Sequence, residues 1–198
     1  GRQWAWNSSS LDPGKACSRE YFYRARRGLR PKIKSADILF GGYYAHALEF
    51  YHHLRAKRWI HKDALQATVQ HVLETTWENG KPWESGDPNK NRETLVRSVV
   101  WYLDAHEHDP CKTIILDSGR PAVELPFRFQ VSDEVWFTGH LDRLVEHNGD
   151  IYVQDQKTTR RTLGAYYFKQ FDLSVQMSLY TLAAQVIWHV PVKGVLID

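Results

Sequence analysis

Three consecutive runs of strand-like residues between positions 123 and 158 constrain the fold more than any other stretch of the chain. In residues 123–131, apolar side chains alternate with polar residues or proline, which is typical of a half-buried strand. Residues 135–145 and 151–158 follow after short turns, and the second turn is Asn148-Gly149, a strong hairpin signal. We therefore expect three strands joined as an antiparallel meander.

Helical periodicity occurs on both sides of these strands. The predicted helices are residues 35–59, 64–77, 94–106 and 171–188. Asp172 is the expected N-cap of the last helix, Gly80 is expected to end the second, and residues 79–91 are a loop by composition. Residues 192–198 predict a final strand. With residues 61–108 treated as a helical insertion, the order is α-β-β-β-α-β. This order predicts an α/β (α+β) fold with a mixed sheet flanked by helices.

Charged residues lie where the second and third predicted strands meet. Side chains alternate faces along a strand, so Asp155 and Lys157 are expected on one face, with Asp142 beside Asp155 across the hairpin. Two adjacent carboxylates favour Mg²⁺ or Mn²⁺, which take oxygen ligands, and the Gln156 carbonyl is a further candidate oxygen. Lys157 would then orient an attacking water and stabilise charge at phosphorus. The competing interpretation is a surface salt bridge between Asp155 and Lys157, the commoner meaning of an isolated D-x-K.

Residues 8–34 form a basic aromatic segment. Between Arg19 and Lys34, seven basic residues stand against one acid, Glu20, with three aromatic residues at 21–23. Such interleaving suits a surface that neutralises phosphates and stacks on unpaired bases. A solvated helix face whose aromatic residues enter the core is an equally open interpretation.

The helix predicted at residues 35–59 carries His46, four residues after Gly42. A glycine one turn before the histidine leaves room for another backbone or for a metal ion. Considered alone, a histidine at such a position is more often a satisfied interior residue than a ligand.

Composition limits the classes of function. The net charge is only +3 and the isoelectric point is near 8.8, so nucleic-acid affinity would have to come from local clusters of charge. Two cysteines cannot form a disulfide framework, which favours an intracellular protein. No apolar run approaches the ~20 residues that cross a bilayer, and we expect no membrane association. We expect one domain over all 198 residues, with a natural chain that continues beyond the last of them.

The motif G-x-x-D at residues 139–142, followed by D-x-K-T-T at residues 155–159, resembles the PD-(D/E)XK nuclease superfamily. Within it, the chain is similar to the RecB-type branch, which includes bacterial recombination nucleases, CRISPR-associated exonucleases and phage exonucleases. G-x-x-x-H at residues 42–46 and Q-x-x-x-Y at residues 176–180 look like two further signatures of that branch, in its order. The resemblance implies a restriction-endonuclease-like core, whose element order is also α-β-β-β-α-β.

The resemblance implies roles for individual residues. The implied ligands of one or two Mg²⁺ or Mn²⁺ ions are His46, Asp142, Asp155 and the Gln156 carbonyl. Lys157 would be the catalytic lysine, and Glu124 is a candidate outer carboxylate. The expected substrate contacts are Gln176, Tyr180, Arg24, Arg26, Arg27 and Arg160.

The function that the resemblance implies is Mg²⁺-dependent hydrolysis of DNA by an exonuclease in recombination, repair, CRISPR or phage DNA processing. Single-stranded or frayed DNA ends are the expected substrate, in the cytoplasm of a bacterial or phage-infected cell or in another intracellular compartment that holds DNA. No helicase motif is present, so duplex opening would need a helicase or recombination partner. The alternative is an inactive nuclease-fold adaptor that binds nucleic acid.

Many relatives in this branch hold an iron–sulfur cluster through four cysteines. Cys17 stands where the first of these would be, whereas Cys111 is in the wrong place. We therefore expect that this chain alone cannot hold such a cluster.

Overall fold

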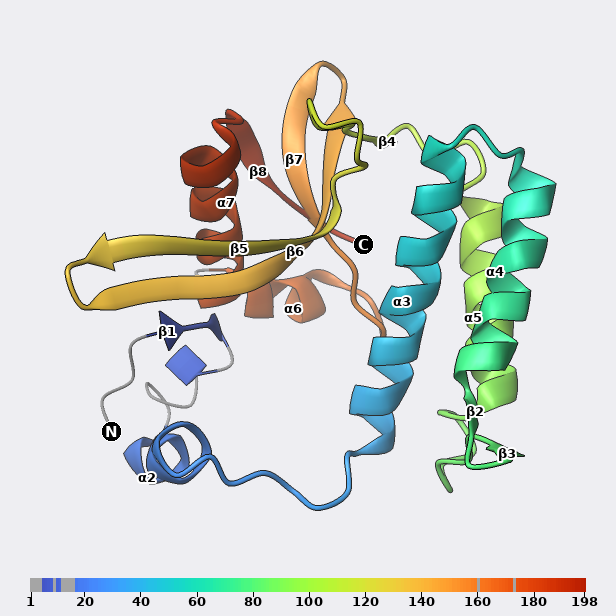
Figure 1. Ribbon diagram of the computed structural model, residues 1–198, viewed down its shortest axis with the longest axis horizontal. Helices are drawn as coiled ribbons and strands as arrows, with labels where there is room; N and C mark the ends of the chain where they lie inside the picture. The colour runs from blue at the N-terminus through green and yellow to red at the C-terminus, as the bar shows by residue number, and fades with distance from the viewer. Residues whose placement is uncertain (1–4, 9, 12–16, 160, 173) are drawn as a thin grey trace. The chain divides into compact units, whose positions relative to one another are not determined.

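The computed structural model describes residues 5–8, 10–11, 17–159, 161–172 and 174–198 (Figure 1). The chain divides into two compact units. The sheet unit comprises Gly1–Lys32 and Glu124–Asp198, and the helical unit comprises Ile33–Val123.

Five described strands of the sheet unit form a mixed sheet. They are β1 (Ala5–Trp6), β5 (Val123–Ser132), β6 (Val135–His147), β7 (Asp150–Asp155) and β8 (Val192–Ile197). The long strand β6 pairs with β5, runs antiparallel to β7 and runs parallel to β1, while β7 runs parallel to β8. The predicted mixed sheet flanked by helices is confirmed, and it is consistent with a restriction-endonuclease-like core.

The β6–β7 hairpin forms at the predicted turn, where Asn148 and Gly149 have φ angles of +53° and +82°. However, β7 ends at Asp155, so the prediction of a strand through residue 158 is wrong. The neighbouring strand β8 ends at Ile197, and two further backbone bonds continue the pairing: the Asp198 N–H donates to the Asp155 carbonyl at 3.0 Å, and the Lys157 N–H donates to the Asp198 carbonyl at 2.8 Å.

From residue 17 onward, the helices in the described part of the sheet unit are short apart from one. They are α2 (Ser18–Tyr21), the π-helical turn Phe22–Arg26, α6 (Ala165–Phe168), the 3-10 turn Lys169–Phe171 and α7 (Val175–Trp188). The predicted start of α7 at residue 171 is wrong, and Ser174 takes the N-cap position in place of Asp172. The rings of Phe168 and Phe171 pack against Tyr167, which makes residues 165–171 a separate compact turn. The helix α7 packs against β7 and β8, the strands that precede and follow it in the chain.

Three helices pack around one core in the helical unit: α3 (Ala36–Ala56), α4 (His61–Thr75) and α5 (Arg92–Ala105). Leu48, Leu95 and Leu103 are fully buried between them. All three helices were predicted, although α4 and α5 begin two or three residues earlier than expected. In the described part of the chain, no helix is long and apolar enough to cross a membrane.

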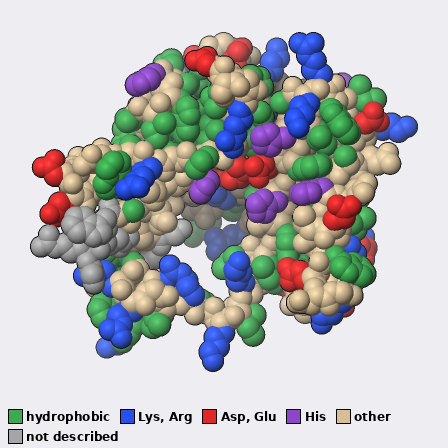
Figure 2. All heavy atoms as spheres, viewed as in Figure 1, with side chains coloured by type: hydrophobic (Ala, Val, Ile, Leu, Met, Phe, Trp, Pro, Cys, Tyr) green, Lys and Arg blue, Asp and Glu red, His purple; other side chains and the backbone are tan. Residues whose placement is uncertain are grey.

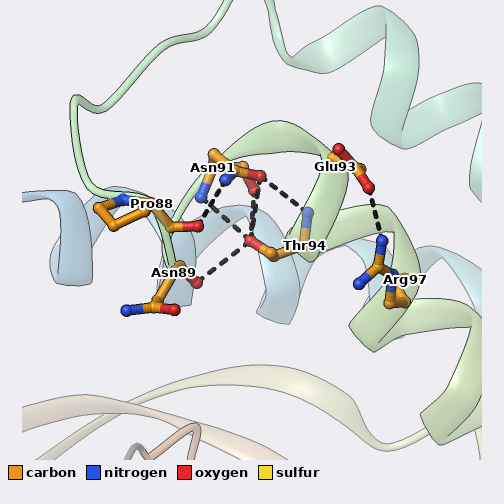
Figure 3. A network of polar contacts seen from close by, with 6 residues as sticks. All are labelled: Pro88, Asn89, Asn91, Glu93, Thr94 and Arg97. Carbon is orange, nitrogen blue, oxygen red and sulfur yellow. Dashed lines mark hydrogen bonds and ion pairs between the residues drawn. The ribbon is translucent and has the colours of Figure 1, made fainter.

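The early start of α5 has a local cause (Figure 3). Asn91 is its N-cap: its Oδ1 accepts from the Thr94 N–H at 2.9 Å, and Thr94 Oγ1 accepts from the Asn91 N–H at 3.1 Å. This reciprocal pair is a capping box with threonine in the third position, a variant of the usual pattern with Glu or Gln. Periodicity alone placed the start at the first apolar repeat and missed the cap.

The loop predicted for residues 79–91 contains a small hairpin, β2 (Trp77–Glu78) with β3 (Lys81–Pro82). Its turn is Asn79-Gly80, with φ angles of +52° and +79°. The same dipeptide marked the larger β6–β7 turn. Here the signal was missed because two-residue strands carry no alternation. A further two-residue strand, β4 (Lys112–Thr113), follows α5.

Candidate active site

Asp142 and Asp155 lie on neighbouring strands of the β6–β7 hairpin. Asp155 ends β7 and has no exposed surface, whereas Asp142 is half-buried. Burial and, second, the charge of Asp155 raise the pKa of Asp142 from 3.8 to about 6. Burial also raises the pKa of Asp155, against the opposing positive charge of Lys157. The hairpin therefore brings together two carboxylates whose negative charges disfavour each other.

Lys157 partly balances this charge. Its Nζ lies 2.5 Å from Asp155 Oδ2, and its side chain is 30% exposed. The backbone around it is held on two sides, because Lys157 N–H donates to the Asp198 carbonyl at 2.8 Å and Gln156 N–H donates to Asp142 Oδ2 at 3.1 Å. The ammonium group is thus fixed beside the carboxylates although Lys157 lies outside the strand.

The carboxylate pair has the chemistry of a divalent-cation site. Both Asp155 oxygens are buried, and this carboxylate interacts with the Lys157 ammonium and the Asp142 carboxyl. Such buried acceptors cost free energy unless a cation or a proton satisfies them. Two carboxylates with one lysine leave a net negative charge, which fits Mg²⁺ or Mn²⁺. Within the described ranges, no group of three or more His, Cys, Asp or Glu side chains is placed to hold a metal ion.

The helix α7 contributes Gln176 and Tyr180 to the same region. Gln176 Nε2 donates to the Tyr180 hydroxyl at 2.6 Å, one helical turn away. Burial raises the pKa of Tyr180, the charge of Asp142 adds to this rise, and the Gln176 donor opposes it. Tyr180 therefore remains a neutral hydroxyl that can donate a hydrogen bond near the carboxylates.

Glu124, the candidate outer carboxylate, stands at the start of β5. Its charge makes the smallest of the contributions that raise the pKa of Tyr180, after burial and the charges of Asp142 and Asp155. Its φ angle of +45° lies in the left-handed region, which non-glycine residues rarely occupy. Strained backbone of this kind is concentrated at functional sites.

A cavity of about 230 Å³ opens beside Asp142, entirely within the sheet unit. Its lining includes Asn7, Ser8, Phe127, Asp142, Gln176 and Tyr180. The candidate carboxylate Asp142 and the α7 pair therefore share a single concave surface, which is the usual setting of an active site.

Gly139 is required at this surface by the ring of Phe127. A Cβ at residue 139 would meet Phe127 Cζ at 2.5 Å and Cε1 at 2.7 Å. The ring has little freedom to move because it is buried and packs against Phe129 and Tyr180. The glycine of the G-x-x-D motif thus has a packing function in addition to its place near Asp142.

We expect Gly139→Ala to destabilise the protein by about 1–3 kcal/mol, the usual cost of overpacking a closed core. Equilibrium denaturation in urea measures the change. Gly194→Ala is the matched control, since a Cβ at this position of β8 meets no atom within 4 Å. Equal unfolding midpoints for the two variants would contradict the steric explanation.

His46 belongs to the helical unit, on α3. Its side chain is 73% exposed, and Nδ1 lies 3.5 Å from Glu49 Oε2. It is therefore not the satisfied interior histidine that residue statistics favoured. Its role as a metal ligand remains a prediction. Cys17, in the sheet unit, and Cys111, in the helical unit, are not joined in a disulfide.

The predicted substrate contacts of the basic aromatic segment lie on the π-helical turn Phe22–Arg26 and directly after it. Arg24, Arg26 and Arg27 are exposed, and Arg160 lies outside the described residues. Phe22 and Tyr23 are 48% and 47% exposed, so they do not enter the core. In Figure 2, blue Lys and Arg side chains and green hydrophobic side chains share the surface over α2, at the lower left. Tyr21 differs from its neighbours because its ring stacks on Trp6, with 5.5 Å between ring centroids.

The prediction from sequence missed Asn7 and Ser8, which line the cavity. Their only sequence signal is an Asn followed three residues later by Ser, a weak helix-start pattern. Nothing in such a pattern indicates that Asn7 and Ser8 lie in the same cavity as Asp142, which is more than 130 positions further along the chain.

Comparison with known families agrees with this geometry. The family model of the PD-(D/E)XK nuclease superfamily matches residues 5–196, which include the β6–β7 hairpin, Lys157 and α7. No curated protein matches the chain. The chain belongs to the PD-(D/E)XK nuclease superfamily, which has a nuclease fold and generally depends on divalent metal ions.

Proposed function

We propose that this protein is a metal-dependent deoxyribonuclease of the RecB-type branch that acts as an exonuclease. The observation that carries the proposal is the buried carboxylate pair of Asp142 and Asp155, with Lys157 Nζ 2.5 Å from one of its oxygens. A buried acidic pair without a cation is costly, so its presence beside a fixed lysine favours a working site.

The proposed ligands are Asp142, Asp155 and the Gln156 carbonyl, with His46 as the ligand that the family resemblance adds. A divalent cation bound there would polarise the scissile phosphate and offset the negative charge that develops during hydrolysis. We propose Mg²⁺ or Mn²⁺, because the carboxylate and carbonyl oxygens are hard ligands.

The remaining residues act on the substrate directly. Lys157 is placed to orient the attacking water and to stabilise the charge on the phosphate oxygens. The neutral Tyr180 hydroxyl, held by Gln176, donates to the substrate from α7. The exposed arginines Arg24, Arg26 and Arg27 and the rings of the basic aromatic segment bind the phosphates and unpaired bases of an incoming strand.

Processing of DNA ends in recombination, repair, CRISPR or phage DNA metabolism fits this chemistry, with a helicase or recombination partner to open duplexes. The adaptor alternative is disfavoured by the site itself. A protein that only binds DNA has no use for two buried carboxylates that repel phosphate, whereas a metal-dependent nuclease requires them.

Digestion of matched linear and covalently closed circular DNA tests the proposal. We expect linear DNA to be degraded from its ends with Mg²⁺ or Mn²⁺, circular DNA to resist, and EDTA to stop the reaction. No cleavage with either metal would contradict the enzyme and favour the adaptor. Equal cleavage of the closed circle would contradict exonuclease action and leave a metal-dependent endonuclease.

A further inference from the structure

The short strand β1 brings a polar turn to the cavity of the candidate active site. Trp6 pairs with Phe137 of β6, and Thr138 Oγ1 donates to the Trp6 carbonyl at 3.4 Å. The chain that leaves β1 therefore starts beside the first residues of β6. Its next two residues, Asn7 and Ser8, line the cavity that contains Asp142.

Hydrogen bonds within the turn hold it in shape independently of the sheet. Asn7 Oδ1 accepts from the Ser10 N–H at 2.9 Å, and Ser10 Oγ accepts from the Asn7 N–H at 3.1 Å. The Ser10 and Leu11 N–H groups both donate to the Asn7 carbonyl at 3.0 Å. Because Oδ1 of Asn7 is already an acceptor within the turn, the Nδ2 group is the part of this side chain that can bind a ligand.

The donors of this turn suit a sugar–phosphate backbone. Ser8 offers a hydroxyl and Asn7 an amide, and such neutral side chains commonly bind phosphate oxygens and fix the register of a strand. On another part of the lining, Gln176 and Tyr180 are also uncharged donors. A phosphate group bound among these uncharged donors would lie beside Asp142, and the turn itself would add no further negative charge.

The turn is also connected to the basic aromatic segment. The rings of Trp6 and Tyr21 stack with an interplanar angle of 1°, so β1 and α2 pack directly against each other within the sheet unit. The exposed Phe22 and Tyr23 follow Tyr21 at once. The strand β1 therefore packs against the basic aromatic segment and is followed directly by residues that line the cavity.

We propose that Asn7 and Ser8 form a substrate subsite that binds a sugar–phosphate unit of the DNA strand next to the scissile bond. The proposal rests on the nuclease function proposed above. It adds binding residues from the N-terminal strand to a site otherwise built from β6, β7 and α7.

Two substitutions test the subsite while keeping the turn. Asn7→Asp retains the Oδ1 acceptor, and Asp is as good an N-cap as Asn, but it replaces the Nδ2 donor with a negative charge. Ser8→Ala removes only the hydroxyl. With a single-stranded fluorescent oligonucleotide, we expect KM to rise about three- to tenfold for Ser8→Ala, the effect of one neutral hydrogen bond. For Asn7→Asp we expect a rise of more than about tenfold, with kcat within about twofold of wild type in both cases.

Matched controls carry the same chemical changes elsewhere in the sheet unit. Ser132→Ala lies at the exposed end of β5, and Asn148→Asp lies in the exposed β6–β7 turn. Both should leave KM unchanged within about twofold. Thermal unfolding of all four variants shows whether each remains folded at the assay temperature.

Oligonucleotide binding separates failure of this proposal from failure of the nuclease function. Fluorescence anisotropy is measured with Mg²⁺ in a Lys157→Ala background, where cleavage is expected to be slow. Adding Ser8→Ala or Asn7→Asp should raise Kd by the same factor as KM. A raised Kd would support the subsite even if the wild-type protein cut no DNA. Unchanged KM and Kd in a wild-type enzyme that cuts DNA would overturn the subsite and leave the nuclease function standing.

Discussion

Replacing Lys157 with alanine is expected to lower the single-turnover rate of DNA cleavage by about 10²–10³-fold, the usual effect of removing one preorganised charge-stabilising group. The Lys157 ammonium lies 2.5 Å from Asp155 Oδ2, and in the proposed function it stabilises the charge that develops on the phosphate. Binding of Mn²⁺, measured by calorimetry, should be retained or tightened in the same variant. The reason is that the substitution removes a positive charge from beside the cation site.

Lys193→Ala is the control for this experiment. Lys193 is an exposed lysine on β8 that also pairs with an aspartate, Asp150, but it lies at the opposite end of β7 from Asp155. Its removal should leave the cleavage rate within about twofold of wild type. A Lys157→Ala enzyme that cut DNA at the wild-type rate would show that the D-x-K lysine is only a structural ion-pair partner.

Replacing Asp142 with asparagine is expected to abolish the thermal stabilisation that Mn²⁺ gives the wild-type protein at pH 7.5. The same variant should be more stable than wild type without metal at that pH, by about 1–3 kcal/mol. Asparagine is isosteric, carries no charge and therefore ends the repulsion between the two buried carboxylates. Differential scanning calorimetry with and without Mn²⁺ measures both effects.

The pH dependence of this difference follows from the raised pKa of Asp142, about 6 in the folded protein against 3.8 for the free side chain. A carboxyl whose pKa is raised by folding stabilises the metal-free protein fully below pH 3.8, and this contribution is lost as the pH rises through about 6. The advantage of Asp142→Asn over metal-free wild type should therefore shrink between pH 7.5 and pH 5. An advantage that is constant over this range, or Mn²⁺ stabilisation that persists in the variant, would contradict the proposed cation site.

Several parts of the fold and site were accessible from sequence because their signals are local. The Asn148-Gly149 turn and the alternation of residues 123–131 each report on neighbours a few positions apart, and the hairpin they imply is confirmed. That hairpin is enough to bring Asp142 near Asp155. Boundaries were less accurate, as at Asp155 and Ser174, because tertiary partners decide where a strand ends or a helix starts.

The sequence predicted that Lys157 lies beside Asp155, which is correct, but it did so by assuming that β7 extends past Asp155. Strand alternation was the argument for placing it on the same face as Asp155, but Lys157 lies beyond the end of β7. A backbone bond to Asp198, the residue that follows the neighbouring strand β8, helps to hold it there. The periodicity of a single strand gives no information about a contact with a residue so distant in the sequence.

The sequence by itself determined the order of the elements, the mixed sheet and the pairing of two acidic residues across one hairpin, because each depends on short-range periodicity and turn chemistry. Only the tertiary structure decided that Asp155 is fully buried, that Phe127 closes over Gly139 and that Asn7 and Ser8 line the cavity beside Asp142. These features arise from packing between strands, and between strands and helices, that are distant in the chain. Solvent exclusion at such contacts, rather than residue type, sets the pKa of a carboxylate and the shape of a pocket.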